Sequence, residues 1–61
     1  MNANDLVAIV TGAGGGVGQA ISKRLYADGA KLVMVGRDLS RLNSFAREFE
    51  DQNRLLPIKA D

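Results

Sequence analysis

The chain of 61 residues contains no cysteine, no histidine and no tryptophan. The absence of cysteine and histidine excludes disulfide bonds, thiolate chemistry, histidine general bases and almost every type of zinc site. We therefore predict no metal site. A chain without thiols fits a reducing compartment, and we expect a cytoplasmic location.

The chain also lacks a large excess of positive or negative charge and has no long hydrophobic run. Eight Lys plus Arg residues against seven Asp plus Glu residues give a net charge of +1, which provides no long-range attraction to nucleic acid or to an acidic membrane. Residues 1–5 carry no positive charge, and the apolar run behind them covers only residues 6–10. We therefore expect no signal peptide, no membrane span and no nucleic-acid partner.

Apolar residues make up 46% of the chain and charged residues 25%, which is the composition of an ordinary globular domain. A chain this short forms about one small domain. We therefore treat residues 1–61 as one part of a single domain and predict no second domain.

Three apolar runs alternate with two amphipathic segments. The runs predict strands at 6–10, 32–35 and 55–58. The segments predict helices at 17–28 and from residue 39 to the polar residues 51–53, which end the second helix. The apolar stripe of the first helix consists of Val17, Ala20, Ile21 and Leu25, and that of the second of Leu39, Leu42, Phe45, Ala46 and Phe49.

Single residues mark the ends and the surroundings of these helices and strands. Gly29 stands where a left-handed residue ends the first helix, and Asp38 can cap the second helix. Arg41, Arg47 and Arg54 are expected on solvated helix surface and at the helix exit. Pro57 lacks the N–H that a ladder needs, so we place the third strand at a sheet edge.

Alternation of strands and helices predicts an α/β fold with a parallel sheet. Because crossovers are right-handed, two successive crossovers in one direction give the strand order 3-2-1 and place both helices on the same face. The first strand is apolar on both faces, with Leu6, Ala8 and Val10 on one and Val7 and Ile9 on the other, so the face that nothing in this chain covers would be apolar. We infer that these residues are one half of a doubly wound sheet. The other half would come from the remainder of the domain or from a partner chain, and that partner could be a second copy of this chain.

Five glycines fall between positions 12 and 18, directly after the first strand and before the first helix. A turn of this kind binds phosphate, because unpaired N–H groups at a helix N-terminus face the ligand and no side chain blocks its approach. We therefore predict a nucleotide phosphate site built from Gly12, Gly14, Gly15, Gly16 and Gly18.

The spacing of the glycines distinguishes between ligands. The dinucleotide pattern GxGxxG is not present. If the pattern starts at Gly12, its last glycine is replaced by Val17, and if it starts at Gly14, its last glycine is replaced by Gln19. A P-loop is excluded because no lysine follows the turn. The pattern GxGxG, at Gly12, Gly14 and Gly16, resembles the first motif of S-adenosylmethionine-dependent methyltransferases, but the acid usual at the strand end is absent.

The segment Thr11-Gly12-x-x-x-Gly16-Val17-Gly18 resembles the cofactor motif of the short-chain dehydrogenase/reductase family. The resemblance extends through KLVMVGRD to the terminal KAD, and so covers the whole chain. It implies a Rossmann-like strand–helix–strand–helix–strand unit that binds a dinucleotide.

The resemblance also implies roles for individual residues. Gly12 would make the turn, Gly16 and Gly18 would let the cofactor and the helix approach the backbone, and Thr11 would fix the turn by hydrogen bonds. Val17 would lie near the cofactor, and Asp61 would approach the amino group of the adenine.

The end of the second strand predicts which dinucleotide binds. An acid there would bind the ribose hydroxyls of NAD, whereas Gly36 leaves room and Arg37 offers donors that suit a 2′-phosphate. We therefore favour NADP(H) over NAD(H), although Gly15 replaces a basic residue that many NADP-preferring members carry. Asp38 could reach a ribose, but its main expected role is the helix cap.

No catalytic residue is predicted within the chain. Family members use Ser, Tyr and Lys, often within Tyr-x-x-x-Lys, but Tyr26 is followed four residues later by Ala30. We infer the NADP(H)-binding N-terminal segment of an oxidoreductase, inactive by itself. The alternative is a non-catalytic nucleotide-binding module that completes its sheet with a partner chain.

Overall fold

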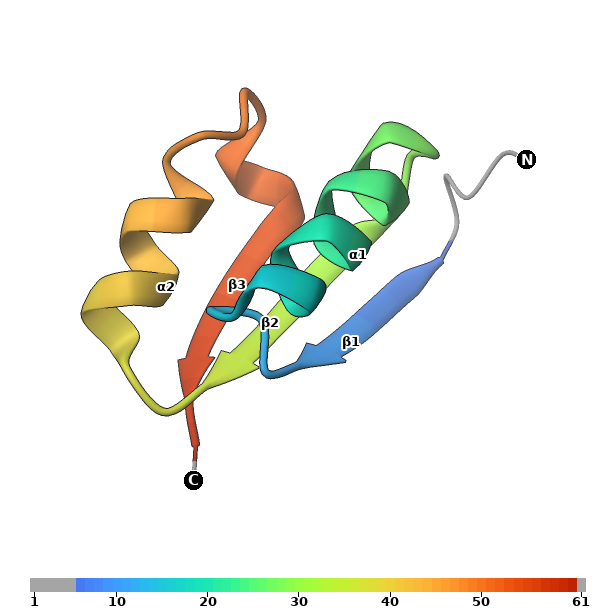
Figure 1. Cartoon of the computed structure of the whole chain (residues 1–61). Helices are drawn as coiled ribbons and strands as arrows, with labels where there is room; N and C mark the ends of the chain where they lie inside the picture. The colour runs from blue at the N-terminus through green and yellow to red at the C-terminus, as the bar shows by residue number, and fades with distance from the viewer. Residues whose placement is uncertain (1–5, 61) are drawn as a thin grey trace.

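The computed structural model describes residues 6–60 and follows the predicted order of strands and helices (Figure 1). The element bounds differ from the predicted ones by a few residues. They are β1 Val7–Thr11, α1 Gly16–Ala27, β2 Lys31–Gly36, α2 Leu39–Ala46, the 3₁₀-helix η1 Gln52–Arg54 and β3 Leu55–Lys59.

The three strands form one parallel sheet in the order β1-β2-β3, so the predicted order 3-2-1 is confirmed. Val10, Met34 and Pro57 lie side by side across the sheet. Pro57 is in β3, which pairs only with β2 among the described residues, and this confirms its place on an edge strand.

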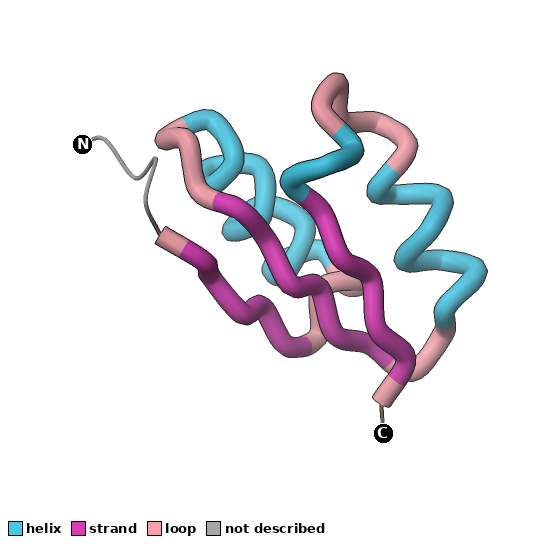
Figure 2. Tube along the Cα trace, turned by 180° about the vertical axis from the view of Figure 1, so that it is seen from behind, coloured by secondary structure: helices cyan, strands magenta, loops and turns pink. Residues whose placement is uncertain are grey.

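Both helices cover one face of the sheet, and the view from behind shows the strands with no helix in front of them (Figure 2). Leu32 and Met34 are buried beneath the helices, against Leu42 and Phe45 of α2. On the other face the side chains of Val7, Ile9 and Leu56 are 64%, 70% and 55% exposed. The structure thus confirms the predicted bare apolar face of an incomplete doubly wound sheet.

The predicted apolar stripe of α1 is confirmed only at Leu25, which packs against the core. Gly18 and Ser22 are the buried residues of this helix, whereas Val17 and Ile21 are 76% and 47% exposed. A Cβ atom at Gly18 would overlap the carbonyl oxygen of Gly12, so this side of the helix must face the turn. The close backbone approach, rather than apolar periodicity, sets the rotation of α1.

The C-terminus of α1 ends as predicted, with Gly29 in the left-handed region at φ 102°. The N–H of Gly29 donates to the carbonyl of Tyr26 at 3.0 Å, and the N–H of Ala30 donates to the carbonyl of Leu25 at 3.0 Å. These two bonds form a Schellman motif, which turns the chain directly into β2.

Helix α2 ends at Ala46, several residues before the predicted end at residues 51–53. The side chain of Gln52 donates to the carbonyl of Ala46, the last residue of the helix, at 2.8 Å and to that of Phe49, in the turn beyond it, at 2.7 Å. Phe49 is nevertheless buried, with its ring 4.7 Å from that of Tyr26 in an edge-to-face arrangement.

Arg54 was expected at a solvated exit, and this is also wrong. Its guanidinium donates to the carbonyls of Tyr26 at 2.7 Å and Ala30 at 2.9 Å, and it lies 3.8 Å from the centre of the Tyr26 ring. Arg54 thus binds the C-terminal end of α1 to the start of β3.

Candidate functional site

A cleft of about 550 Å³ lies at the carboxyl ends of the strands. The glycine turn forms one wall, and the end of β2 with the start of α2 forms the other. Its lining residues are Thr11, Gly12, Gly14, Gly15, Val35, Gly36, Arg37, Asp38, Arg41, Leu42 and Ala60.

The glycine turn is held by its own hydrogen bonds and by β2. Gly12 adopts φ 65°, which side chains rarely accept, and its carbonyl accepts from the N–H of Gly15 at 3.0 Å. The N–H of Ala13 donates to the carbonyl of Val35 at 3.1 Å, and the Gln19 side chain donates to the carbonyl of Gly14 at 3.2 Å. These bonds fix the turn before any ligand arrives.

Helix α1 begins directly after the turn, with Gly15 as its N-cap. No side chain caps this end, and the first turn contains no acidic residue. The first N–H groups of a helix have no partner within it, and the helix dipole gives them partial positive charge. The start of α1 is therefore suited to an anion.

Gly16, Val17 and Gly18 do not line the cleft. A Cβ atom at Gly16 would meet nothing within 4 Å, whereas a Cβ atom at Gly18 would lie 2.8 Å from the Cα atom of Ala13. Gly18 thus serves the packing of α1 against the turn.

Asp38 caps α2 as predicted. Its Oδ1 atom accepts from the N–H of Arg41 at 3.1 Å, which satisfies one of the free donors of that helix. Gly36, two residues earlier, provides the room for Leu42, since a Cβ atom at Gly36 would lie 3.3 Å from the Leu42 side chain.

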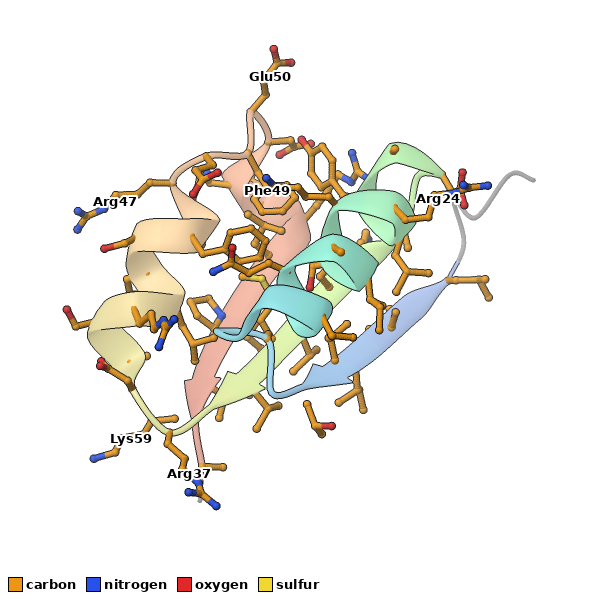
Figure 3. The ribbon with its side chains drawn as sticks, viewed as in Figure 1. Arg24, Arg37, Arg47, Phe49, Glu50 and Lys59 are labelled. Carbon is orange, nitrogen blue, oxygen red and sulfur yellow. The ribbon has the colours of Figure 1, made fainter. Side chains whose placement is uncertain are left out.

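Arg37 is exposed and lines the cleft at the end of β2. Figure 3 shows Arg37 and Lys59 at the same end of the molecule, with Arg47 at the other end of α2. Arg41 is exposed, as predicted, and it also lines the cleft, which the sequence pattern does not show. Its place in the first turn of α2, four residues after Arg37, was the signal that could have identified it.

Six of the ten predicted site residues thus lie together in one cleft, three lie at the start of α1 beside it, and Asp61 is outside the described residues. Within residues 6–60, no three acidic, cysteine or histidine side chains gather in a way that could hold a metal ion. None of the helices in this part of the chain has the length and apolar character needed to cross a membrane.

A glycine turn between a strand and a helix, with a cleft beyond the carboxyl ends of parallel strands, defines the nucleotide-binding class of α/β folds. The model of the short chain dehydrogenase family matches residues 6–61. The chain therefore belongs to the short-chain dehydrogenase/reductase family, as the motif predicted.

Individual relatives agree with this assignment. An uncharacterized oxidoreductase of Staphylococcus aureus is 43% identical over 54 residues, which are 87% of this chain and 23% of the relative. One of Staphylococcus epidermidis is 52% identical over 42 residues, or 69% of this chain and 18% of the relative.

A solved structure extends the comparison to three dimensions. The crystal structure of a short-chain dehydrogenase/reductase from Brucella melitensis, described as a glucose/ribitol dehydrogenase, superposes with a TM-score of 0.91 at 36% identity. The match covers 100% of this chain and 27% of that one. The present chain thus spans about a quarter of the length of such relatives.

Proposed function

We propose that this chain is the NADP(H)-binding segment of a short-chain dehydrogenase/reductase-type oxidoreductase. The observation that carries the proposal is the position of Arg37, which lines the same cleft as the glycine turn. One wall then suits the pyrophosphate of the cofactor, and the other suits the phosphate on its adenosine ribose.

The pyrophosphate site consists of backbone groups. No side chain caps the start of α1, so its first N–H groups remain available to a phosphate. Gly12, Gly14 and Gly15 line the cleft and have no side chains that would block the ligand. Thr11 lines the cleft beside them and would hold the turn. Val17, on the exposed first turn of α1, and Asp61 would contact the cofactor at its edges, and these two contacts remain predictions.

The preference for NADP(H) rests on the charges at the end of β2. An NAD site commonly places an acid here, where it binds the ribose hydroxyls and repels a 2′-phosphate. Asp38 is the one acid lining the cleft among residues 6–60, and it already accepts the N–H of Arg41. Arg37 supplies a planar set of donors that can bind two phosphate oxygens at once.

The segment should not catalyse hydride transfer alone. A reduction of this type needs a proton donor beside the substrate carbonyl. Tyr26 lies near the C-terminal end of the 12-residue α1, whereas the cleft lies at the N-terminal end of that helix. Its hydroxyl instead accepts from the N–H of Asp51 at 2.9 Å. Catalytic residues would have to come from further polypeptide, and a cytoplasmic location stays a prediction.

The bare sheet face favours a second candidate, a non-catalytic nucleotide-binding module completed by a partner chain. Val7, Ile9 and Leu56 form apolar surface that a stable protein covers. We propose that the remainder of the domain, or failing that a partner chain, packs on this face.

Titration of the purified protein, at the length its gene encodes, tests these proposals. We expect NADP(H) to bind more tightly than NAD(H), and S-adenosylmethionine not to bind. Absence of binding by either dinucleotide would reject the cofactor site. A stoichiometric complex of separate chains that binds NADP(H) but reduces no carbonyl substrate would favour the module.

A further inference from the structure

We propose that Arg41 is a second cation of the 2′-phosphate site and acts together with Arg37 to select NADP(H). The inference rests on the proposed function, because it assigns a further ligand of the same cleft. The glycine turn carries no charged side chain, whereas Arg41 lines the cleft from α2. The second positive charge would therefore come from α2 rather than from the glycine turn.

The path of the Arg41 side chain brings it to the cleft. Arg41 lies in the first turn of α2, three residues after the cap Asp38. Its Cδ and Cγ atoms are 3.6 and 3.8 Å from the position that a Cβ atom of Gly14 would occupy. The aliphatic stem of Arg41 thus extends from α2 to the glycine turn, and it lines the cleft along the way.

The absence of a side chain at Gly14 is part of this arrangement. A Cβ atom there would make ordinary contact with the Arg41 stem, and a longer side chain would compete with it for the same space. Gly14 therefore contributes an open surface along which the arginine lies, in addition to any contact with the cofactor.

Within the described part of the chain, no side chain takes up the guanidinium donors of Arg37 or Arg41. The ion pairs within residues 6–60 are Lys23 with Glu48 and Arg24 with Asp28, so neither Arg37 nor Arg41 has a carboxylate partner there. The Asp38 carboxylate accepts from the backbone N–H of Arg41, and no ion pair joins it to the Arg41 guanidinium.

A phosphate monoester is the ligand chemistry that fits two such groups. It carries a charge of about −1.5 to −2 at neutral pH and has three acceptor oxygens, which exceeds what one bidentate guanidinium satisfies. Arg37 approaches from the end of β2 and Arg41 from α2, so the two side chains come from adjoining elements on the same wall of the cleft. A nucleotide whose ribose lacks the 2′-phosphate would gain little binding affinity from the second cation.

The test compares 2′,5′-ADP with 5′-AMP, which differ only in the 2′-phosphate. Binding is measured by calorimetry on the protein at the length its gene encodes, for the wild type, Arg41→Ala and Arg41→Lys. We expect Arg41→Ala to lower the affinity for 2′,5′-ADP about ten- to hundredfold, as for the loss of a charged hydrogen bond. The affinity for 5′-AMP should fall less than about twofold. Arg41→Lys should recover part of the loss, because it restores the charge without the fork.

Folding should survive these changes. The donor of the α2 cap is the backbone N–H of residue 41, and alanine and lysine both favour helices. Lys59→Ala is the matched control, because Lys59 lies at the same end of the molecule as Arg37 but does not line the cleft (Figure 3). It should leave the discrimination between the two nucleotides unchanged.

The outcomes separate the two proposals. A wild-type protein that does not distinguish 2′,5′-ADP from 5′-AMP would overturn the NADP(H) preference itself. A wild-type preference that persists in Arg41→Ala would overturn only the role of Arg41. Equal losses in Arg41→Ala and Lys59→Ala would also overturn that role, because a diffuse positive field would then explain the effect.

Discussion

Gly18 on α1 packs against the carbonyl oxygen of Gly12 so closely that no side chain fits between them. We therefore predict that Gly18→Ala destabilises the protein by about 1–3 kcal/mol, as overpacking against backbone atoms does. Gly16→Ala is the matched control, since a Cβ atom there meets nothing within 4 Å. Thermal unfolding should show a lower midpoint for Gly18→Ala alone, and equal midpoints would contradict the packing role.

Gly12 adopts φ 65°, with open space around the position of a Cβ atom. Gly12→Val should abolish NADP(H) binding with the fold retained, because a β-branched residue disfavours this conformation and projects into the cleft. Fluorescence titration with NADPH checks the affinity, and circular dichroism checks the fold. Undiminished affinity in a folded variant would remove the turn from the site.

Arg37 lines the cleft at the end of β2. We expect Arg37→Ala to lower the affinity for NADP(H) about ten- to hundredfold and the affinity for NAD(H) much less, because only NADP(H) carries the 2′-phosphate. Arg47→Ala, at the other end of α2, removes an equal charge from outside the cleft and should change neither affinity (Figure 3). Equal losses for both cofactors in Arg37→Ala would reject the assignment.

Gly36 stands at the position where an acid would select NAD(H). Gly36→Asp should lower the affinity for NADP(H) relative to NAD(H) by about tenfold or more, through repulsion of the 2′-phosphate. Gly36→Ala controls for the crowding of Leu42, whose side chain lies 3.3 Å from the added Cβ atom. If alanine shifts the ratio of the two dissociation constants as much as aspartate does, repulsion is not the cause.

Arg54 donates to two carbonyls at the end of α1 and stacks on Tyr26. Arg54→Ala should destabilise the protein by about 1–3 kcal/mol, because two part-buried carbonyls lose a charged donor. Chemical denaturation measures the free energy of unfolding, with Arg47→Ala as the exposed control. A stability equal to that of the control would show that water replaces the guanidinium without cost.

Local chemistry explains why several elements were predicted correctly. Asp38 caps α2 and Gly29 ends α1 through interactions within a few residues of each, which sequence patterns record directly. The end of α2 was missed because Gln52 binds the carbonyls of Ala46 and Phe49, a contact that forms only after the chain has turned.

The wrong position predicted for Arg54 and the missed place of Arg41 in the cleft have a related cause. Arg41 and Arg54 are both charged residues next to helices, and charge alone predicts a solvated surface. Their surroundings depend on segments distant in the chain: Gly14 for Arg41, and the end of α1 for Arg54. A flexible arginine stem can reach such partners in several directions, so the sequence pattern does not specify which one it meets.

The sequence by itself determined the strand order, the bare apolar face of the sheet, the position of the glycine turn, the end of α1 at Gly29 and the cap of α2 at Asp38. These follow from residue periodicity, crossover handedness and local hydrogen bonds. Only the tertiary structure decided which side of α1 faces the sheet and that Arg41 joins Arg37 in the cleft. Both depend on contacts between backbone and side-chain atoms of separate elements, at Gly12 with Gly18 and at Gly14 with Arg41, and such contacts exist only once the elements have packed.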